Sequence, residues 1–225
     1  MTIFDIFHAA ANPEKAVAMS AYMRDQFKFL GIPTQERKNL SAEFLKTSVF
    51  KVADQTTKID WEFIFYCWSC EEREFQYLAL NYLSNCKAFL SPKDIPNLKK
   101  IATSKSWWDT IDCLDRIVGS IALNFPKTNQ ILLKWSTDAN FWLRRIAIDH
   151  QIGRKEKTDT ALLEEIIKNN FGQTEFFINK AIGWSLREYG KTNPTWVRNF
   201  IEKHKGEMSR LSVREGGKYV LQTGA

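Results

Sequence analysis

Aromatic and apolar residues recur along this chain at intervals that lengthen gradually from 33 to 36 residues. The recurring positions are Phe75, Trp108, Trp142, Phe177 and Val213. Each lies early in a segment whose apolar residues are spaced three or four apart, which predicts a helix. A second capped helix is expected before each of these segments, and such a drifting period is typical of helix pairs stacked into a solenoid. No run of strict alternation predicts a strand, so the sequence predicts an all-α solenoid with a concave binding face.

Capping residues and prolines mark the expected helix boundaries. A helix is expected to start at 12–14, where Asn, Pro and Glu follow one another, and to end at Gly31. Thr34 is expected to cap the next helix, and further starts are expected at 91–94 and 193–194. The spacing between these boundaries fits helices throughout the chain.

Composition indicates a packed protein with one domain covering residues 1–225. The apolar content is 44%, and 10 glycines and 6 prolines leave room for few irregular stretches. The net charge of +6 is consistent with binding a polyanion such as DNA. The first eight residues lack the basic and apolar pattern of a secretory leader, and no stretch is apolar enough to span a bilayer. We therefore expect a cytoplasmic protein with no membrane partner.

The four cysteines are expected to be structural. Cys67, Cys70, Cys86 and Cys113 all fall in helical patterns, which predicts buried thiols in a reducing compartment. Cys67 and Cys70 have the spacing of a redox pair, yet no strand precedes them and no second pair completes a zinc site. The sequence predicts no metal site.

Residues 104–121 are predicted to form one helix with two distinct faces. Its core stripe consists of Trp107, Ile111, Leu114, Val118 and Ile121. On a neighbouring face, Trp108, Asp112 and Asp115 follow one another at steps of four and three, which places an indole and two carboxylates together. This second face is not needed for the core.

A later helix, predicted over 175–190, carries an aromatic residue among cations. Trp184 lies opposite the apolar stripe of this segment, with Lys180 and Arg187 at steps of four and three from it. In the repeat between, Arg145 follows Trp142 by three residues. We expect Trp142 to be buried, and the solenoid to bring Arg145 and Trp184 onto the surface that carries Trp108 and Asp112.

These residue types together fit cleavage of an N-glycosidic bond. Cations attract phosphates, indoles stack on bases or attract cationic rings, and a carboxylate stabilises the positive charge that develops on the sugar. A base alkylated on a ring nitrogen is already cationic and leaves without a general acid. Simpler interpretations stay open: tryptophans on helices are most often core residues, Asp115 could pair with Arg116 or Arg187, and Asp109 could compensate the first-turn charge.

Other catalytic schemes fit less well. His8, His150 and His204 are scattered, and no glycine-rich phosphate loop or metal-ligand cluster appears. A Schiff-base lysine stays open, with Lys105 and Lys180 nearest the expected site. A helical-repeat adaptor without catalysis, binding DNA or protein, is the alternative from a different class.

Several segments, in order along most of the chain, resemble one family. They are residues 12–16, 29–32, 72–76 and 105–109, Trp142-Leu143 with Arg145, and 176–178 through 192–194. In these the chain resembles the AlkD-like bacterial DNA glycosylases of the HEAT-like repeat superfamily. The resemblance implies a right-handed α-solenoid of HEAT-like helix pairs with a concave basic face. It also implies a monofunctional enzyme that excises N3- or N7-alkylated purines from duplex DNA, without a cofactor and without flipping the lesion into a pocket. A single capped solenoid with one DNA face suggests a monomer.

The resemblance also assigns roles to individual residues. Asp112 would be the catalytic carboxylate, Trp108 and Trp184 would contact the damaged nucleotide, and Arg145 would contact a phosphate. The remaining DNA contacts would be Thr34, Lys38, Arg187, Arg214 and Lys218.

The chain departs from the family pattern at two internal places, besides an N-terminus that looks a few residues shorter. Pro33 stands where relatives can carry a DNA-contacting glutamine, and Gly216-Gly217 weakens the propensity of the last helix by roughly 2 kcal/mol. Both departures bear on DNA affinity more than on catalysis.

Overall fold

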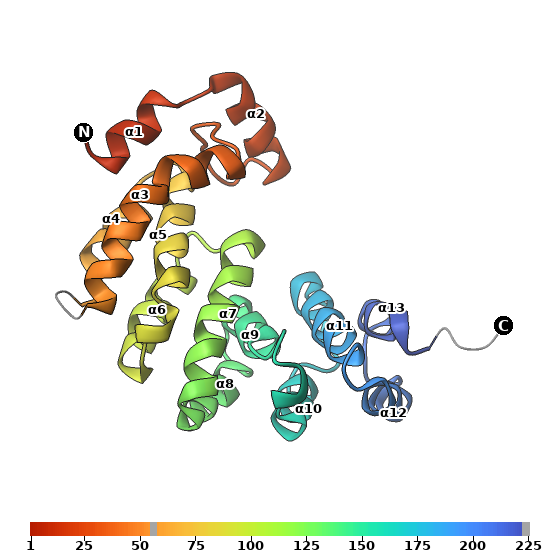
Figure 1. Ribbon diagram of the computed structural model, residues 1–225. Coiled ribbons are helices and arrows are strands. Elements are labelled where there is room, and N and C mark those ends of the chain that lie inside the picture. The colour runs from red at the N-terminus through yellow and green to blue at the C-terminus, as the bar shows by residue number, and fades with distance from the viewer. Residues whose placement is uncertain (55–57, 222–225) are drawn as a thin grey trace. The chain divides into compact units, whose positions relative to one another are not determined.

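The computed structural model describes residues 1–54 and 58–221, and within these ranges the chain is helical and contains no strand (Figure 1). The residues divide into two compact units, Met1–Leu90 and Ser91–Ala225. The predicted all-α class is confirmed, whereas the single domain over 1–225 stays a prediction. No helix within the described residues has the length and apolar character needed to cross a membrane.

The first unit contains five α-helices in its described residues. They are α1 (Ile3–Ala9), α2 (Pro13–Tyr22), α3 (Thr34–Ala53), α4 (Trp61–Ser69) and α5 (Arg73–Asn85). Helix α5 packs against α3 and α4, and α1 packs against α3. The ring of Phe75, the first of the repeat positions, is fully buried and stacks on Phe7 with centroids 5.8 Å apart.

The boundaries of α2 and α3 are partly as expected. The Asn12 side chain accepts a hydrogen bond from the Lys15 amide at 3.0 Å, so the predicted cap of α2 is confirmed. The predicted end at Gly31 is wrong, because α2 ends at Tyr22. The assignment of Thr34 as a cap is wrong by one residue: Thr34 is the first residue of α3, and the carbonyl of Pro33 accepts the Arg37 amide at 2.9 Å.

A buried carboxylate holds the irregular segment between α2 and α3. The Glu74 side chain accepts three backbone amides, from Leu30 at 3.0 Å, Gly31 at 2.9 Å and Ile32 at 3.1 Å. Gly31 has a φ of +86°, and a Cβ there would lie 2.0 Å from the carbonyl oxygen of Asn12. The segment therefore needs both a glycine and a buried acid from α5 to hold its conformation.

The second unit contains eight α-helices in its described residues. They are α6 (Ile95–Ala102), α7 (Trp108–Asn124), α8 (Asn129–Trp135), α9 (Phe141–Asp149), α10 (Thr160–Lys168), α11 (Phe176–Gly190), α12 (Pro194–His204) and α13 (Arg210–Gly216). Helices α7, α9, α11 and α13 contact one another in that order, while α6 and α8 pack against α9, and α12 packs against α11 and α13. Such stacked helix pairs are consistent with an α-solenoid. The repeat positions fall on α5, α7, α9, α11 and α13, as the period predicts.

Small residues allow the stacked helices to approach closely. A Cβ on Gly119 of α7 would lie 2.1 Å from the carbonyl oxygen of His150, at the end of α9. A Cβ on Gly183 of α11 would lie 2.5 Å from the Cβ of Glu215 on α13. At the end of α13, a Cβ on Gly216 would lie 3.0 Å from Leu186. Gly216 and Gly217, which lower the helix propensity, thus lie at the end of α13, where α11 packs closely.

The central helix α7 is shorter than the sequence predicts. It starts at Trp108 rather than at residue 104, and Trp107 precedes it in an extended conformation with φ −157°. The predicted core stripe is otherwise confirmed, since Ile111, Leu114, Val118 and Ile121 are at most 1% exposed. Trp107 still has a scaffold contact, because its ring packs against those of Trp142 and Phe177 with centroids 6.0 and 5.3 Å away.

The starts predicted at 91–94 and 193–194 are confirmed. Ser91 and Asp94 form a capping box around a short 3₁₀ turn that leads into α6, and the Asn193 side chain accepts the Trp196 amide at 3.0 Å. Within the described residues, none of the four cysteines forms a disulfide. Cys67 and Cys86 are buried, as predicted, and burial raises the pKa of Cys67, whereas Cys70 and Cys113 are partly exposed.

Candidate active site

Asp112 and Arg145 form a two-pronged ion pair between α7 and α9. Arg145 Nε donates to Asp112 Oδ1 at 2.8 Å, and Nη2 donates to Oδ2 at 3.0 Å. The Arg145 side chain is 4% exposed and that of Asp112 is 22% exposed. The carboxylate of Asp112 therefore reaches solvent on one side. On the other side the buried guanidinium of Arg145 fixes the plane of this carboxylate, because two parallel hydrogen bonds between planar groups set their relative orientation.

Arg145 also ties the pair to α11. Its Nη1 donates to the carbonyl oxygen of Phe177 at 2.7 Å, near the start of that helix. One side chain thus joins α7, α9 and α11. The sequence predicts Arg145 as a phosphate contact on the solvated face, but the structure buries this side chain and directs its hydrogen bonds inward. A phosphate contact stays a prediction.

Burial and ion pairing act on these two groups in opposite directions. Burial raises the pKa of Asp112 above its usual value, and the hydrogen bonds and charge of Arg145 counteract part of that rise. For Arg145, burial lowers the pKa, but the nearby carboxylates of Asp149, Asp112 and Asp115 outweigh it, so the pKa is raised and the guanidinium stays charged.

Trp184 lies beside this ion pair. Its ring centroid is 6.0 Å from Arg145 Cζ and 5.5 Å from Arg116 Cζ, and the side chain is partly exposed. The structure therefore brings Trp184 together with the Asp112–Arg145 pair, as the repeat predicts. Trp108 is partly exposed in the first turn of α7, one turn before Asp112.

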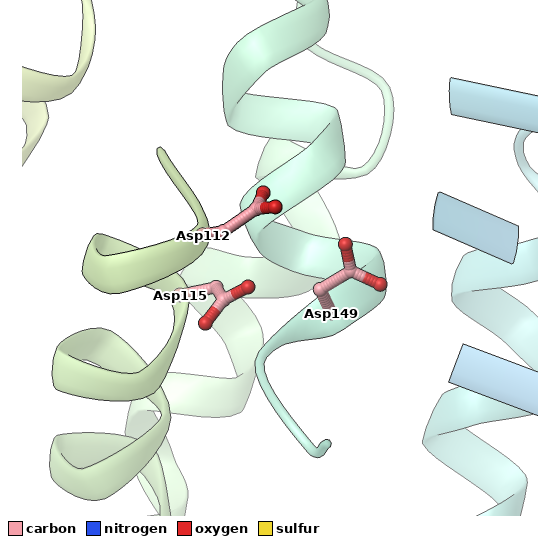
Figure 2. Close-up of side chains that lie close together, drawn as sticks. All are labelled: Asp112, Asp115 and Asp149. Atoms are coloured by element: carbon pink, nitrogen blue, oxygen red, sulfur yellow. The ribbon is translucent and has the colours of Figure 1, made fainter. Parts of the chain in front are cut away.

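Two further aspartates, Asp115 and Asp149, lie close to Asp112 and are more deeply buried. Figure 2 shows Asp112 and Asp115 of α7 close to Asp149 of α9, and one oxygen of each lies within 4.8 Å of the others. Asp115 and Asp149 are fully buried. The expectation that Asp115 shares a solvated face is therefore wrong, because the approach of α9 covers it.

The alternatives left open for Asp115 are resolved by its contacts. Asp115 Oδ1 lies 3.0 Å from Arg116 Nε, so the pairing with Arg116 is confirmed, whereas Arg187 contacts Glu215 instead. Burial and the neighbouring Asp149 raise the pKa of Asp115 well above its usual value. Burial also raises the pKa of Asp149, to about 8, against the opposing charge of Arg145.

The three carboxylates are close enough to hold a metal ion. Two guanidinium groups already lie against them, since Arg145 pairs with Asp112 and Arg116 pairs with Asp115. A metal cation would meet those positive charges and would have to displace the two-pronged contact. The cluster is therefore better described as carboxylates that are partly neutralised by two arginines.

The predicted DNA-contacting residues are spread over both units. In the second unit, Glu215 Oε2 lies 3.1 Å from Arg187 Nη1 and 3.0 Å from Lys180 Nζ, so this acid partly neutralises both cations. Arg214 is 75% exposed, and Lys218 Nζ lies 5.9 Å from the ring of Tyr219. In the first unit, Thr34 and Lys38 are exposed on α3.

Asp149 was not predicted as a site residue, and Arg116 was predicted only as a possible partner of Asp115. The spacing of Arg145 and Asp149, four residues apart on one helix, places them on the same face and was the available signal. In the structure, Arg145 Nη2 lies 3.9 Å from Asp149 Oδ2. Only the packing of α7 on α9 shows that both belong beside Asp112.

An aromatic cluster supports the site at the starts of the stacked helices. The ring of Trp142, which is buried as predicted, lies 4.9 Å from that of Phe177 and 6.0 Å from that of Trp107. These contacts connect the starts of α7, α9 and α11, the three helices that Arg145 also joins. By packing the starts of these three helices together, the aromatic cluster supports the Asp112–Arg145 ion pair.

Fold and site together define a helical-repeat protein with a partly exposed carboxylate, held by a buried arginine beside an indole. A family model described as DNA alkylation repair enzyme matches residues 5–220. The chain belongs to this family, which supports a role in DNA repair, an enzymatic activity and DNA as the partner.

Comparison with solved structures agrees with this assignment. The chain is 37% identical to "Predicted DNA alkylation repair enzyme from Enterococcus faecalis", with a TM-score of 0.86, covering 95% of this chain and 98% of that one. It is 16% identical to smu.31 from Streptococcus mutans UA159, with a TM-score of 0.60, covering 83% of this chain and 98% of that one, a likeness that shows the fold alone. A comparison with curated proteins found no match.

Proposed function

We propose that the protein is an AlkD-like, monofunctional DNA glycosylase that hydrolyses the N-glycosidic bond of cationic N3- or N7-alkylated purines in duplex DNA. The observation that carries the proposal is the ion pair of Asp112 and Arg145, in which a buried guanidinium fixes a carboxylate that still reaches solvent. Membership of a DNA alkylation repair family supports the same class of substrate.

The charge of Asp112 suits stabilisation of a cationic sugar. Each carboxylate oxygen has more than one lone pair, so Asp112 can receive Arg145 and still face a substrate. Burial of the site strengthens the attraction between this carboxylate and a positive charge that develops nearby. Because Arg145 holds the carboxylate plane before DNA arrives, little reorganisation is needed during the reaction.

In the proposed reaction the bond between C1′ of the deoxyribose and the purine nitrogen breaks. Its electron pair goes to the purine, which loses its positive charge and leaves as a neutral base. The sugar becomes an oxocarbenium ion that Asp112 stabilises, and a water oriented by the same carboxylate adds to C1′. The water loses a proton to solvent, and an abasic site is the product.

The two tryptophans are proposed to hold the damaged nucleotide. Trp184 already lies against the cationic edge of the site and is partly exposed, and Trp108 lies one turn from Asp112. Indole faces can contact the deoxyribose and attract a cationic ring. No enclosed pocket is required for this arrangement, so we propose that the lesion is processed without being flipped into one.

DNA phosphates are proposed to contact the basic and polar residues of both units. These are Thr34, Lys38, Arg187, Arg214 and Lys218. Arg145 is proposed to position Asp112 rather than to bind phosphate as its main role, because its hydrogen bonds join Asp112 and Phe177. We propose that the protein acts as a monomer without a cofactor.

The alternative is a weakly active or inactive helical-repeat protein that binds DNA or another protein. One observation favours it: Glu215 neutralises part of the charge of Lys180 and Arg187, which weakens the attraction of this surface for phosphates. The same ion pair argues against Lys180 as a Schiff-base nucleophile, because that reaction needs an uncharged amine.

Base-release profiling from alkylated duplex DNA separates these possibilities. The glycosylase should release 3-alkyladenine and 7-alkylguanine as free bases, and it should bind duplex DNA with an affinity that falls steeply with salt. Salt-dependent binding without base release would support the inactive DNA-binding alternative. A crosslink to abasic DNA after borohydride treatment would support a lysine nucleophile instead.

A further inference from the structure

We propose that Asp115 and Asp149 together hold one proton at neutral pH, and that this half-neutralised acid pair positions Asp112 by leaving Arg145 bound to it. The functional consequence rests on the proposed glycosylase activity, whereas the protonation itself does not. The two aspartates are positioning residues, since they act on Asp112 through Arg145.

The acids of this cluster outnumber its cations. The carboxylates of Asp112, Asp115 and Asp149 lie within 4.8 Å of one another, while two guanidinium groups, of Arg145 and Arg116, lie against them. Full ionisation would leave one excess negative charge in this cluster, in which Asp115 and Asp149 are fully buried while Asp112 and Arg116 reach solvent. One bound proton makes the cluster neutral, and a buried unpaired charge is far more costly than a neutral acid.

The two buried acids also lack well-aligned hydrogen-bond donors. Within the described chain, none of the four carboxylate oxygens of Asp115 and Asp149 receives a hydrogen bond of good geometry, although Asp115 Oδ1 is in ionic contact with Arg116 Nε at 3.0 Å and Asp149 Oδ2 lies 3.9 Å from Arg145 Nη2. Both side chains are fully buried. An ionised carboxylate in such a place normally accepts several donors, as Glu74 does from three backbone amides in the first unit. A protonated acid has less need of them.

The groups that face the pair come from three helices. Arg145 lies on α9 with Asp149, α7 contributes Asp112 and Arg116, and α11 contributes the ring of Trp184. His150 follows Asp149, and burial lowers its pKa to about 3, so it adds no positive charge at neutral pH. Arg145 and Arg116 are therefore the cations available to this cluster.

Arg145 has two possible carboxylate partners, Asp112 and Asp149, and its Nη2 is near both of them. It binds Asp112 through two hydrogen bonds of 2.8 and 3.0 Å, while its Nη2 lies only 3.9 Å from Asp149 Oδ2. When the buried pair is fully ionised, the attraction of Arg145 toward Asp149 grows and its contact with Asp112 weakens. When the pair keeps its proton, the guanidinium holds both oxygens of Asp112.

Because the pKa values of the two acids are raised in the folded protein, the free energy of unfolding depends on pH. In the unfolded chain these acids lose their protons near their ordinary value of 3.8. The folded state therefore keeps a proton that the unfolded state releases, and its stability falls as the pH rises from about 4 toward about 8. Above that range this contribution becomes constant.

The test compares wild type with Asp115→Asn and with Asp149→Asn in urea unfolding at pH 5, 6 and 7. Asparagine has the shape of a protonated aspartate and cannot ionise. The ratio of each variant's folding equilibrium constant to that of wild type should rise by about tenfold per pH unit. Glu165→Gln, at an exposed position on α10, is the matched control and should give a constant ratio. Constant ratios for both asparagine variants would overturn the proposal.

A pH profile of base release adds a readout that a purely structural role would not change. Wild-type activity should fall at alkaline pH as the pair loses its last proton, and the fall should be absent from Asp149→Asn, in which no ionised acid at position 149 can draw Arg145 away from Asp112. An unchanged alkaline fall in Asp149→Asn would contradict the positioning role. If no protein releases base but the unfolding ratios rise as expected, the proposed function fails while the shared proton stands.

Discussion

Arg145 holds Asp112 with two parallel hydrogen bonds, from Nε to Oδ1 at 2.8 Å and from Nη2 to Oδ2 at 3.0 Å. The two residues lie 33 positions apart, on helices of successive repeats. Each of these two repeats therefore contributes one member of the ion pair, and the stacking of α7 on α9 brings the two side chains together. The function that we propose depends on this contact more than on any single side chain.

Arg145→Lys should separate a positioning role from a phosphate contact. A lysine keeps the charge but cannot form the two parallel bonds to Asp112. We expect the single-turnover rate of base release to fall by about 100-fold, since small misplacements of a reacting group have effects of that size. The salt dependence of duplex binding should stay the same. A slope reduced by about one phosphate, with little change in rate, would instead support the phosphate contact.

Trp184→Leu should weaken catalysis while the fold is kept. The ring is partly exposed and contacts Arg116 and Arg145 through its face. Loss of an indole that attracts a cation of the substrate should lower the rate by about tenfold, given the size of cation–π interactions. Trp196→Leu on α12, where the indole stacks on Phe200, is the matched control for the loss of a tryptophan. Equal rates in both variants would remove Trp184 from the site.

Gly119→Ala should disturb the stacking of α7 on α9. The added Cβ would lie 2.1 Å from the carbonyl oxygen of His150, so the two backbones must separate. We expect unfolding to become easier by about 2 kcal/mol, as for other overpacked positions, and base release to fall as the Asp112–Arg145 contact lengthens. Gly206→Ala, where a Cβ meets no atom within 4 Å, should leave thermal denaturation and activity unchanged.

Glu215→Gln should strengthen binding to duplex DNA. The substitution removes the negative charge that lies 3.1 Å from Arg187 Nη1 and 3.0 Å from Lys180 Nζ. Those cations become more available to phosphates, so we expect the affinity to rise a few-fold at low salt, with a steeper salt dependence. Titration of fluorescent duplex DNA at several salt concentrations measures both effects. Unchanged affinity would show that this part of α11 and α13 does not face the DNA.

Much of the fold could be predicted from helical spacing alone. The spacing of apolar residues reflects burial on one side of each helix, so the core stripe of α7 and the order of the stacked helices followed from it. Helix ends were harder to predict, because they depend on contacts from distant residues. The segment before α3 is held by Glu74 of α5, and Trp107 is drawn into an aromatic cluster with Trp142.

The candidate site was only partly predictable for the same reason. Trp108, Asp112 and Trp184 could be proposed as site residues because they lie off the apolar stripes of their own helices. Whether Arg145 faces solvent or the neighbouring helix depends on how α9 packs against α7, which the spacing does not determine. Asp149 was missed because an aspartate at the end of a short helix resembles an ordinary surface charge until packing buries it.

The central claim is that Asp112 stabilises the departure of a cationic base, and Asp112→Asn tests it most directly. Duplex DNA with 7-methylguanine at one position is incubated with wild type and with the variant at saturating protein, and the released base is measured over time. We predict that wild type releases 7-methylguanine, and that the variant binds the duplex but releases base about 100-fold or more slowly. Equal release by both proteins would contradict it.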